Sequence, residues 1–89
     1  MRPERFICHR TKAQGVFEDK KGKIFVTKFR KKDGSERRMV AKLAKRAEFN
    51  RRHPYLLVHD MQKAGAYRRI NLDTVRWIAD KHEEVYFVD

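Results

Sequence analysis

The side chains that could perform catalysis are few and poorly placed for it. Cys8 and His9 are neighbours in the chain, so in a strand they point to opposite faces and cannot act together as thiolate and imidazole. Glu83 and Glu84 are also neighbours, in a polar segment where solvation explains them. No glycine-rich phosphate loop is present. We therefore expect no enzyme and no cofactor, although a metal-independent nuclease built from His and Lys stays open because such a site leaves little signature.

The histidines do not form a metal-binding pattern. His9, His53, His59 and His82, together with the single cysteine Cys8, lack the spacing of zinc ligands. Zinc sites combine closely spaced pairs of Cys or His, so we expect no metal site. One cysteine allows no intrachain disulfide, which indicates a reducing compartment.

Basic side chains are the chemistry that this sequence concentrates. The formal net charge is +11, and residues 1–53 hold 18 Lys and Arg against six acidic residues, whereas residues 54–89 hold five against six. Each Lys or Arg that neutralises a phosphate releases a counterion, so a clustered basic segment suits a nucleic-acid backbone. The alternative is an ordinary solvated face. The predicted nucleic-acid-binding residues are Lys28, Arg30, Lys31, Lys32, Arg37, Arg38, Lys42, Lys45, Arg46, Phe49, Arg51, Arg52, Tyr55 and Arg68.

Two aromatic residues among the cations are candidates for base stacking. Phe49 lies between basic residues of the segment 44–53, and Tyr55 follows it closely. Stacking of a base on an aromatic ring contributes ~1–3 kcal/mol, and it favours single strands whose bases are accessible. Phe25, Phe29 and Trp77 occupy alternating positions of predicted strands, so we expect them in the core.

Alternation and turn residues predict a mostly β chain. Asp33-Gly34 marks a tight turn between two strands, and Met39, Ala41 and Leu43 share the core side of the second one. Residues 44–53 are predicted as a short helix or an ordered basic connector ended by Pro54. Strands are predicted over 23–30, 36–43, 56–61, 66–71 and 76–79. A one-turn connection is predicted over 72–75, and 85–88 and 6–9 are candidates for edge strands or segments packed across an opening.

Five short strands with tight hairpins fit a small closed barrel, because closure removes edges that would aggregate. We expect a single domain over 1–89. Within it, residues 1–21 form an N-terminal extension of uncertain structure, with 10–21 unassigned. Residues 22–79 form the barrel core, and 80–89 form a C-terminal edge strand or tail.

Several short motifs resemble a known family. The run from Phe29 to Met39, Val58-His59-Asp60 and the run from Tyr67 to Val75 resemble the small bacteriophage proteins described as a WYL-like family with an Sm-like barrel. The resemblance covers about residues 24–79. It implies an SH3-like, Sm-like β-barrel encoded by a phage or a related mobile element. It also implies Arg68 as an anion contact, the alternative being that Arg68 pairs with Asp60 or Asp73.

These features predict a non-catalytic module that binds RNA or single-stranded DNA through the basic hairpin and connector. Duplex DNA stays an option, because a two-stranded ribbon such as the Lys31-Lys32 tip can enter a groove. The alternative function is a phage accessory protein that binds an acidic surface of a host protein or nucleoprotein complex and inhibits or redirects it. No apolar run is long enough to span a membrane or form a signal peptide, so we expect a cytoplasmic protein, in the bacterial host if phage-encoded. A homo-oligomer is compatible with pairing of residues 85–88 between chains.

Overall fold

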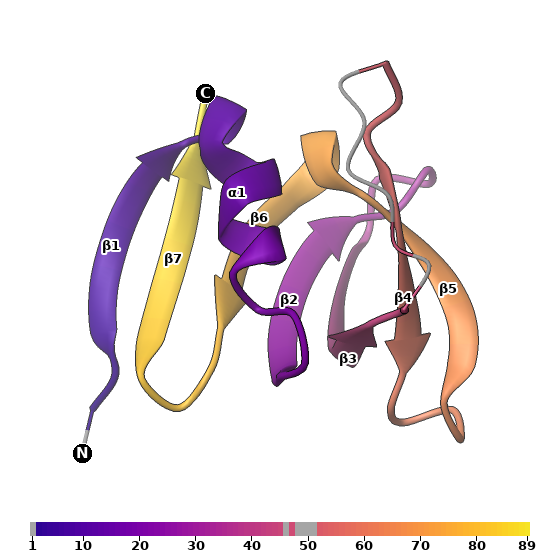
Figure 1. Ribbon diagram of the computed structural model, residues 1–89. Coiled ribbons are helices and arrows are strands. Elements are labelled where there is room, and N and C mark those ends of the chain that lie inside the picture. Colours follow the sequence, from indigo (N-terminus) through magenta and orange to yellow (C-terminus); the bar gives the residue numbers. More distant parts are fainter. Residues whose placement is uncertain (1, 46, 48–51) are drawn as a thin grey trace.

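One seven-stranded sheet organises the molecule. The computed structural model describes residues 2–45, 47 and 52–89. The strand order is β1-β7-β6-β2-β3-β4-β5, and six neighbouring pairs form the sheet (Figure 1). The strands are β1 (Glu4–His9), β2 (Ile24–Arg30), β3 (Glu36–Leu43), β4 (Tyr55–Asp60), β5 (Ala66–Asn71), β6 (Val75–Ala79) and β7 (Glu83–Val88). The helical segments are η1 (Arg10–Lys12), α1 (Ala13–Glu18) and η2 (Leu72–Thr74).

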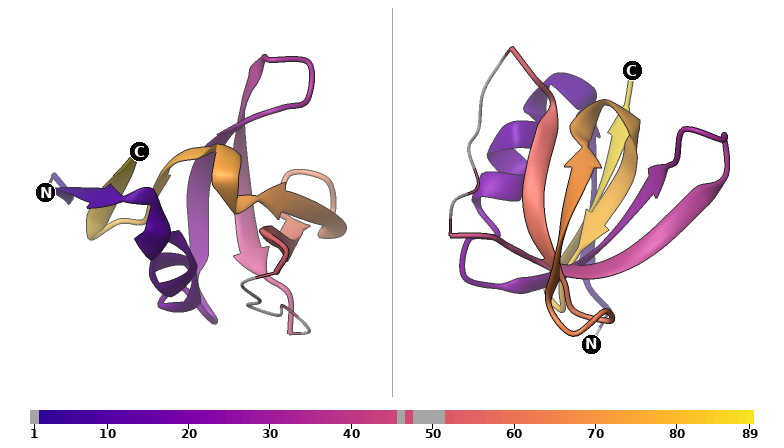
Figure 2. Two further views of the ribbon diagram at one scale, coloured as in Figure 1. Left: turned by 90° about the horizontal axis from the view of Figure 1, so that it is seen from above. Right: turned by 90° about the vertical axis from the view of Figure 1, so that its right-hand side faces the viewer.

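The hairpin of β2 and β3 is confirmed where Asp33-Gly34 predicts it. Gly34 adopts a φ of 87°, which an L side chain rarely adopts. Lys31 donates its N–H to the Ser35 carbonyl at 2.7 Å, closing the turn. Met39, Ala41 and Leu43 are buried as expected, and the turn projects beyond the rest of the sheet (Figure 2). The basic tip is therefore held outward by a rigid pair of strands.

The second hairpin ends in a tight link that turns the chain toward β2. Strand β5 has the predicted bounds, and η2 occupies the predicted one-turn connection. Asn71 Oδ1 accepts the Asp73 N–H at 2.9 Å, and the Thr74 hydroxyl donates to the Asn71 carbonyl at 2.9 Å. Strand β6 then pairs with β2, with Val75 beside Phe29. This link brings the ends of β5 and β2 close together.

The mostly β fold is confirmed, but the prediction of a closed five-strand barrel is wrong. The sheet has seven strands and is not closed, and among the described residues no pairing joins β5 to β1. Residues 85–88 are not an edge, because β7 lies between β6 and β1. Strand β1 pairs with β7 in parallel, from Glu4 beside Glu83 to His9 beside Val88. These two terminal strands extend one side of the sheet instead of wrapping across its opening.

The core lies on one face of the sheet, and the N-terminal segment contributes to it. Residues 10–21, unassigned from the sequence, contain η1 and α1. Phe17 of α1 is fully buried and lies edge-on to Phe25, with ring centroids 5.5 Å apart. It also stacks on Phe87 of β7 at 6.4 Å. Helix α1 of the N-terminal segment therefore packs into the same core as the strands.

Trp77 is not in that core, contrary to expectation, whereas Phe25 and Phe29 are. The pairing of β2 with β6 shifts register between Lys28 and Phe29. Ile78 therefore lies beside the buried Thr27, and Trp77 lies beside Lys28 on the other face, where it is half-buried. A bulge of this kind reverses which side chains face inward, and a single strand's sequence does not display it.

A buried ion pair fastens the turn after α1 to the β6–β7 turn. Lys20 is 2% exposed, and its Nζ lies 3.0 Å from Asp80 Oδ2 and also contacts Glu83 Oε1. Burial alone would raise the pKa of Asp80. Hydrogen bonds from Lys20 and from the backbone N–H groups of His82 and Glu83 outweigh burial and lower this pKa from 3.8 to about 2. This cation therefore has a structural role.

Candidate nucleic-acid interface

The strands divide the predicted basic residues between two faces and several environments. Arg37 faces the core side and donates from Nη2 to Oδ2 of the fully buried Asp60 at 2.9 Å. Lys28 lies on the outer face, with Nζ 3.6 Å from Glu36 Oε1. Arg76 also contacts Glu36, at 3.1 Å. Some of the cations predicted to bind nucleic acid therefore already form ion pairs with carboxylates of this chain.

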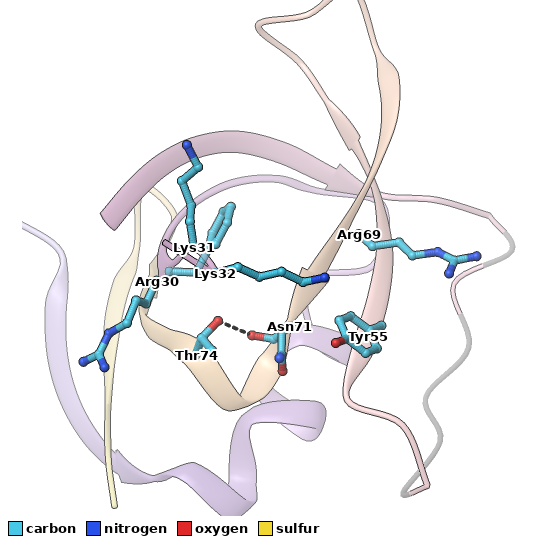
Figure 3. Close-up of a pocket in the computed structure, with 8 residues that line it drawn as sticks. Arg30, Lys31, Lys32, Tyr55, Arg69, Asn71 and Thr74 are labelled. Atoms are coloured by element: carbon cyan, nitrogen blue, oxygen red, sulfur yellow. Dashed lines mark hydrogen bonds between the residues drawn. The ribbon is translucent and has the colours of Figure 1, made fainter. Parts of the chain in front are cut away.

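A cleft collects the basic residues that lack such partners. It has a volume of about 520 Å³ and lies where the end of β2, the β2–β3 turn, η2 and the β4–β5 hairpin converge (Figure 3). Its lining residues are Phe29, Arg30, Lys31, Lys32, Tyr55, Arg69, Asn71 and Thr74. The link through η2 explains the convergence, because it places Asn71 and Thr74 next to the end of β2.

The cleft carries an excess of positive charge. No Asp or Glu is among the lining residues that the structure describes. Within residues 2–45, 47 and 52–89, no ion pair involves Arg30, Lys31, Lys32 or Arg69, and all four are exposed. In Figure 3 Lys32 extends toward Asn71 and Tyr55, whereas Arg30 points away from them. A polyanion entering here meets four cations that form no ion pair with a described carboxylate.

The nearest carboxylate in sequence belongs to the hairpin turn and is otherwise engaged. Asp33 Oδ1 accepts from the Ser35 hydroxyl at 2.6 Å and from the Ser35 N–H at 2.9 Å. These two hydrogen bonds lower the pKa of Asp33 below its usual 3.8, and the charge of Lys31 acts in the same direction. Asp33 shapes the turn and offsets only part of the charge at its tip.

Uncharged groups in the cleft add an aromatic ring and a hydrogen-bond donor. Tyr55 is 45% exposed at the start of β4. Asn71 uses Oδ1 to hold η2, which leaves its NH₂ group without a hydrogen-bond partner in the described part of the chain. A ring, a neutral donor and several cations form the combination that single-stranded nucleic acids require: bases stack, and phosphates accept hydrogen bonds.

The remaining predicted residues lie elsewhere or outside the described residues. Arg38 and Lys42 are exposed on the outer face of β3. Lys45 and Arg52 are exposed beyond the strands. Arg46, Phe49 and Arg51 fall outside the described residues, as does half of the connector 44–53.

Arg68 is exposed but takes neither partner considered for it. Asp60 pairs with Arg37, and within residues 2–45, 47 and 52–89 no ion pair involves Asp73. Arg68 lies beside Val58, on the core side of β5, so its neighbour Arg69 enters the cleft instead. Ile70 is buried, so the alternation along β5 could have indicated that Arg69 faces outward. No local pattern in the sequence indicates that Thr74 lines the cleft.

No other candidate site emerges from the ionisable residues. Within the described ranges, no group of three His, Cys, Asp or Glu side chains is arranged to hold a metal ion. Cys8 is half-buried, and its Sγ contacts the His9 carbonyl. The cleft is therefore the feature that the sequence and the structure jointly single out.

Comparisons with protein-family models, with curated proteins and with solved structures found no match to this chain. No helix in the described part of the molecule has the length and apolar character needed to cross a bilayer.

Proposed function

We propose that this protein binds single-stranded nucleic acid, RNA or DNA, without catalysis, and that the cleft is the binding site. The observation that carries the proposal is the set of four exposed cations, Arg30, Lys31, Lys32 and Arg69, in a cleft whose described lining residues include no carboxylate. Cations that a protein needs for its own stability are paired, as Lys20 is. Unpaired cations that line one cleft repel each other and are compensated when an anion binds.

The aromatic ring supports single strands over duplexes. Tyr55 shares the cleft with the cations and exposes 45% of its surface. A single strand can place a base on this ring while its phosphates contact Lys32 and Arg69, whereas a duplex hides its base faces within the stack. The cytoplasm, indicated by the single cysteine, is the location that we propose for this role.

Fluorescence anisotropy with labelled single- and double-stranded RNA and DNA, repeated over a salt series, tests the proposal. We expect single strands to bind most tightly, with an affinity that falls steeply as salt rises. Tighter binding of duplexes would reject the single-strand assignment. Absence of binding to all four ligands at low salt would reject nucleic acid altogether and favour an acidic protein surface, the alternative partner.

Paired variants test whether the cleft is the site. Lys31→Gln, Lys32→Gln and Arg69→Gln together remove three charges from its wall. The control, Lys21→Gln, Lys63→Gln and Lys81→Gln, removes the same charge from exposed positions that do not line the cleft. We expect the first variant to lose at least about tenfold in affinity, and the control to lose much less, because contact and not only net charge is removed. Equal losses would place the binding surface elsewhere.

A further inference from the structure

The outer face of β4 and β5 carries a second exposed aromatic ring, outside the cleft. Tyr67 of β5 lies beside His59 of β4 in the register of the two strands. Their ring centroids are 4.5 Å apart with planes inclined by 39°. Tyr67 is nevertheless 62% exposed, so the contact with His59 covers only part of its ring.

The histidine holds this tyrosine in place. The Nδ1–H group of His59 donates to the Gly65 carbonyl at 2.9 Å, in the turn that joins the two strands. This hydrogen bond fixes the orientation of the imidazole, and the imidazole in turn supports the Tyr67 ring. An aromatic side chain that is already ordered loses little rotamer entropy on binding a ligand, which makes it a suitable stacking surface.

The strand register connects this ring to the cleft. Tyr67, Arg69 and Asn71 alternate along β5, so they project from the same face, and Tyr55 lies beside Asn71. The rise of about 3.3 Å per residue places the Tyr67 position about 13 Å from the Tyr55 position, with Arg69 midway. Stacked nucleotides rise about 3.4 Å each, so this distance corresponds to about four steps between bases, which join about five nucleotides.

We propose that Tyr67, supported by His59, is a second base-stacking subsite, and that a single strand of about five nucleotides runs from it past Arg69 to Tyr55. This inference rests on the proposed function, because the cleft supplies the first subsite and most of the charge. Lys42 of β3 lies beside His59 of β4 on the same face of the sheet. It offers a further phosphate contact near Tyr67. The ligand is thus a short single strand and not a mononucleotide.

Competition with unlabelled oligouridines of two, four, six and eight nucleotides against a labelled octamer tests this inference. The variants are Tyr67→Ala, Tyr67→Phe, which keeps the ring, and Tyr55→Ala. Phe6→Ala removes an exposed aromatic residue from the opposite edge strand and serves as the control. Circular dichroism spectra and unfolding midpoints verify that each variant is folded.

We expect Tyr67→Ala to weaken the hexamer and octamer by about tenfold and to leave the dimer within about twofold. Tyr55→Ala should weaken all lengths, and Tyr67→Phe and Phe6→Ala should bind as the wild type does. Unchanged octamer affinity in folded Tyr67→Ala, with a loss in Tyr55→Ala, would overturn the second subsite and leave the proposed function intact. If no oligonucleotide binds the wild type at low salt, the proposed function fails, and this inference fails with it.

Discussion

Lys20 and Lys32 are the same kind of residue in the same basic half of the sequence, and the structure uses them in opposite ways. Lys20 is 2% exposed between the carboxylates of Asp80 and Glu83. Lys32 is exposed in the wall of a cleft where no carboxylate is among the described lining residues. The difference teaches that charge density in the sequence does not identify a binding surface. What identifies it is which cations the fold leaves uncompensated.

The largest expected effect belongs to Lys20→Met. The substitution leaves the carboxylates of Asp80 and Glu83 without their cation, in a site where the Asp80 side chain is 8% exposed. Removing one partner of a buried ion pair costs about 3–5 kcal/mol. Urea unfolding at pH 7 measures this loss. Lys32→Met is the matched control and should change stability by less than about 0.5 kcal/mol. Similar unfolding midpoints for the two variants would contradict the comparison.

Two adjacent arginines sharpen the comparison within one strand. Arg37→Gln removes the cation that pairs with fully buried Asp60, and we expect a loss of about 2–3 kcal/mol because the hydrogen bond to a charged group is lost. Arg38→Gln, on the exposed outer face, should leave stability nearly unchanged. Thermal or urea unfolding distinguishes them. A destabilised Arg38→Gln with a normal Arg37→Gln would reverse the two assignments.

Acid should weaken the paired region and not the cleft. The pKa of Asp80 is about 2 in the folded protein and 3.8 without its partners. A lowered folded pKa means that the stabilisation is present above pH 3.8 and disappears as pH falls toward 2, a loss of about 2 kcal/mol. Unfolding measured between pH 5 and 2 in the wild type and in Asp80→Asn tests this. A pH dependence that is the same in both proteins would show that another group is responsible.

The smallest effect on stability, and a specific one on binding, is expected in the cleft. Lys32→Gln and Arg69→Gln should each reduce the slope of log affinity against log salt by about one, because each removes one phosphate contact. Anisotropy titrations between low and moderate salt give this slope. Lys63→Gln, outside the cleft, should leave the slope unchanged. An unchanged slope in Arg69→Gln would remove that residue from the phosphate path.

Much of the local structure could be predicted from the sequence, because its causes are local. Alternation placed Met39, Ala41 and Leu43 on the buried side of β3, and Asp33-Gly34 placed the turn. The bounds of β5 follow from the same pattern. The pairing of β1 with β7 and the burial of Phe17 depend on contacts between distant segments, and the unclosed sheet depends on them as well.

The residues predicted from the sequence and the lining of the cleft overlap in part. Arg30, Lys31, Lys32 and Tyr55 line the cleft, as does Arg69, in whose place Arg68 was predicted from the sequence. The resemblance to the phage WYL-like family, and the phage origin that it implies, stay predictions. So do the roles of Arg46, Phe49 and Arg51, which lie outside the described residues.

By itself the sequence determined the excess of positive charge, the turns and the buried side of the central hairpin, because composition and alternation depend on near neighbours in the chain. Only the tertiary structure decided which cations form ion pairs within the protein and which line a cleft. Lys20 contacts Asp80, which lies 60 residues away in the sequence. Lys32 and Asn71 are also distant in sequence, and they line the same cleft because η2 turns the chain back toward β2. Such partners are chosen by how the strands pack, because an electrostatic contact depends on distance in space.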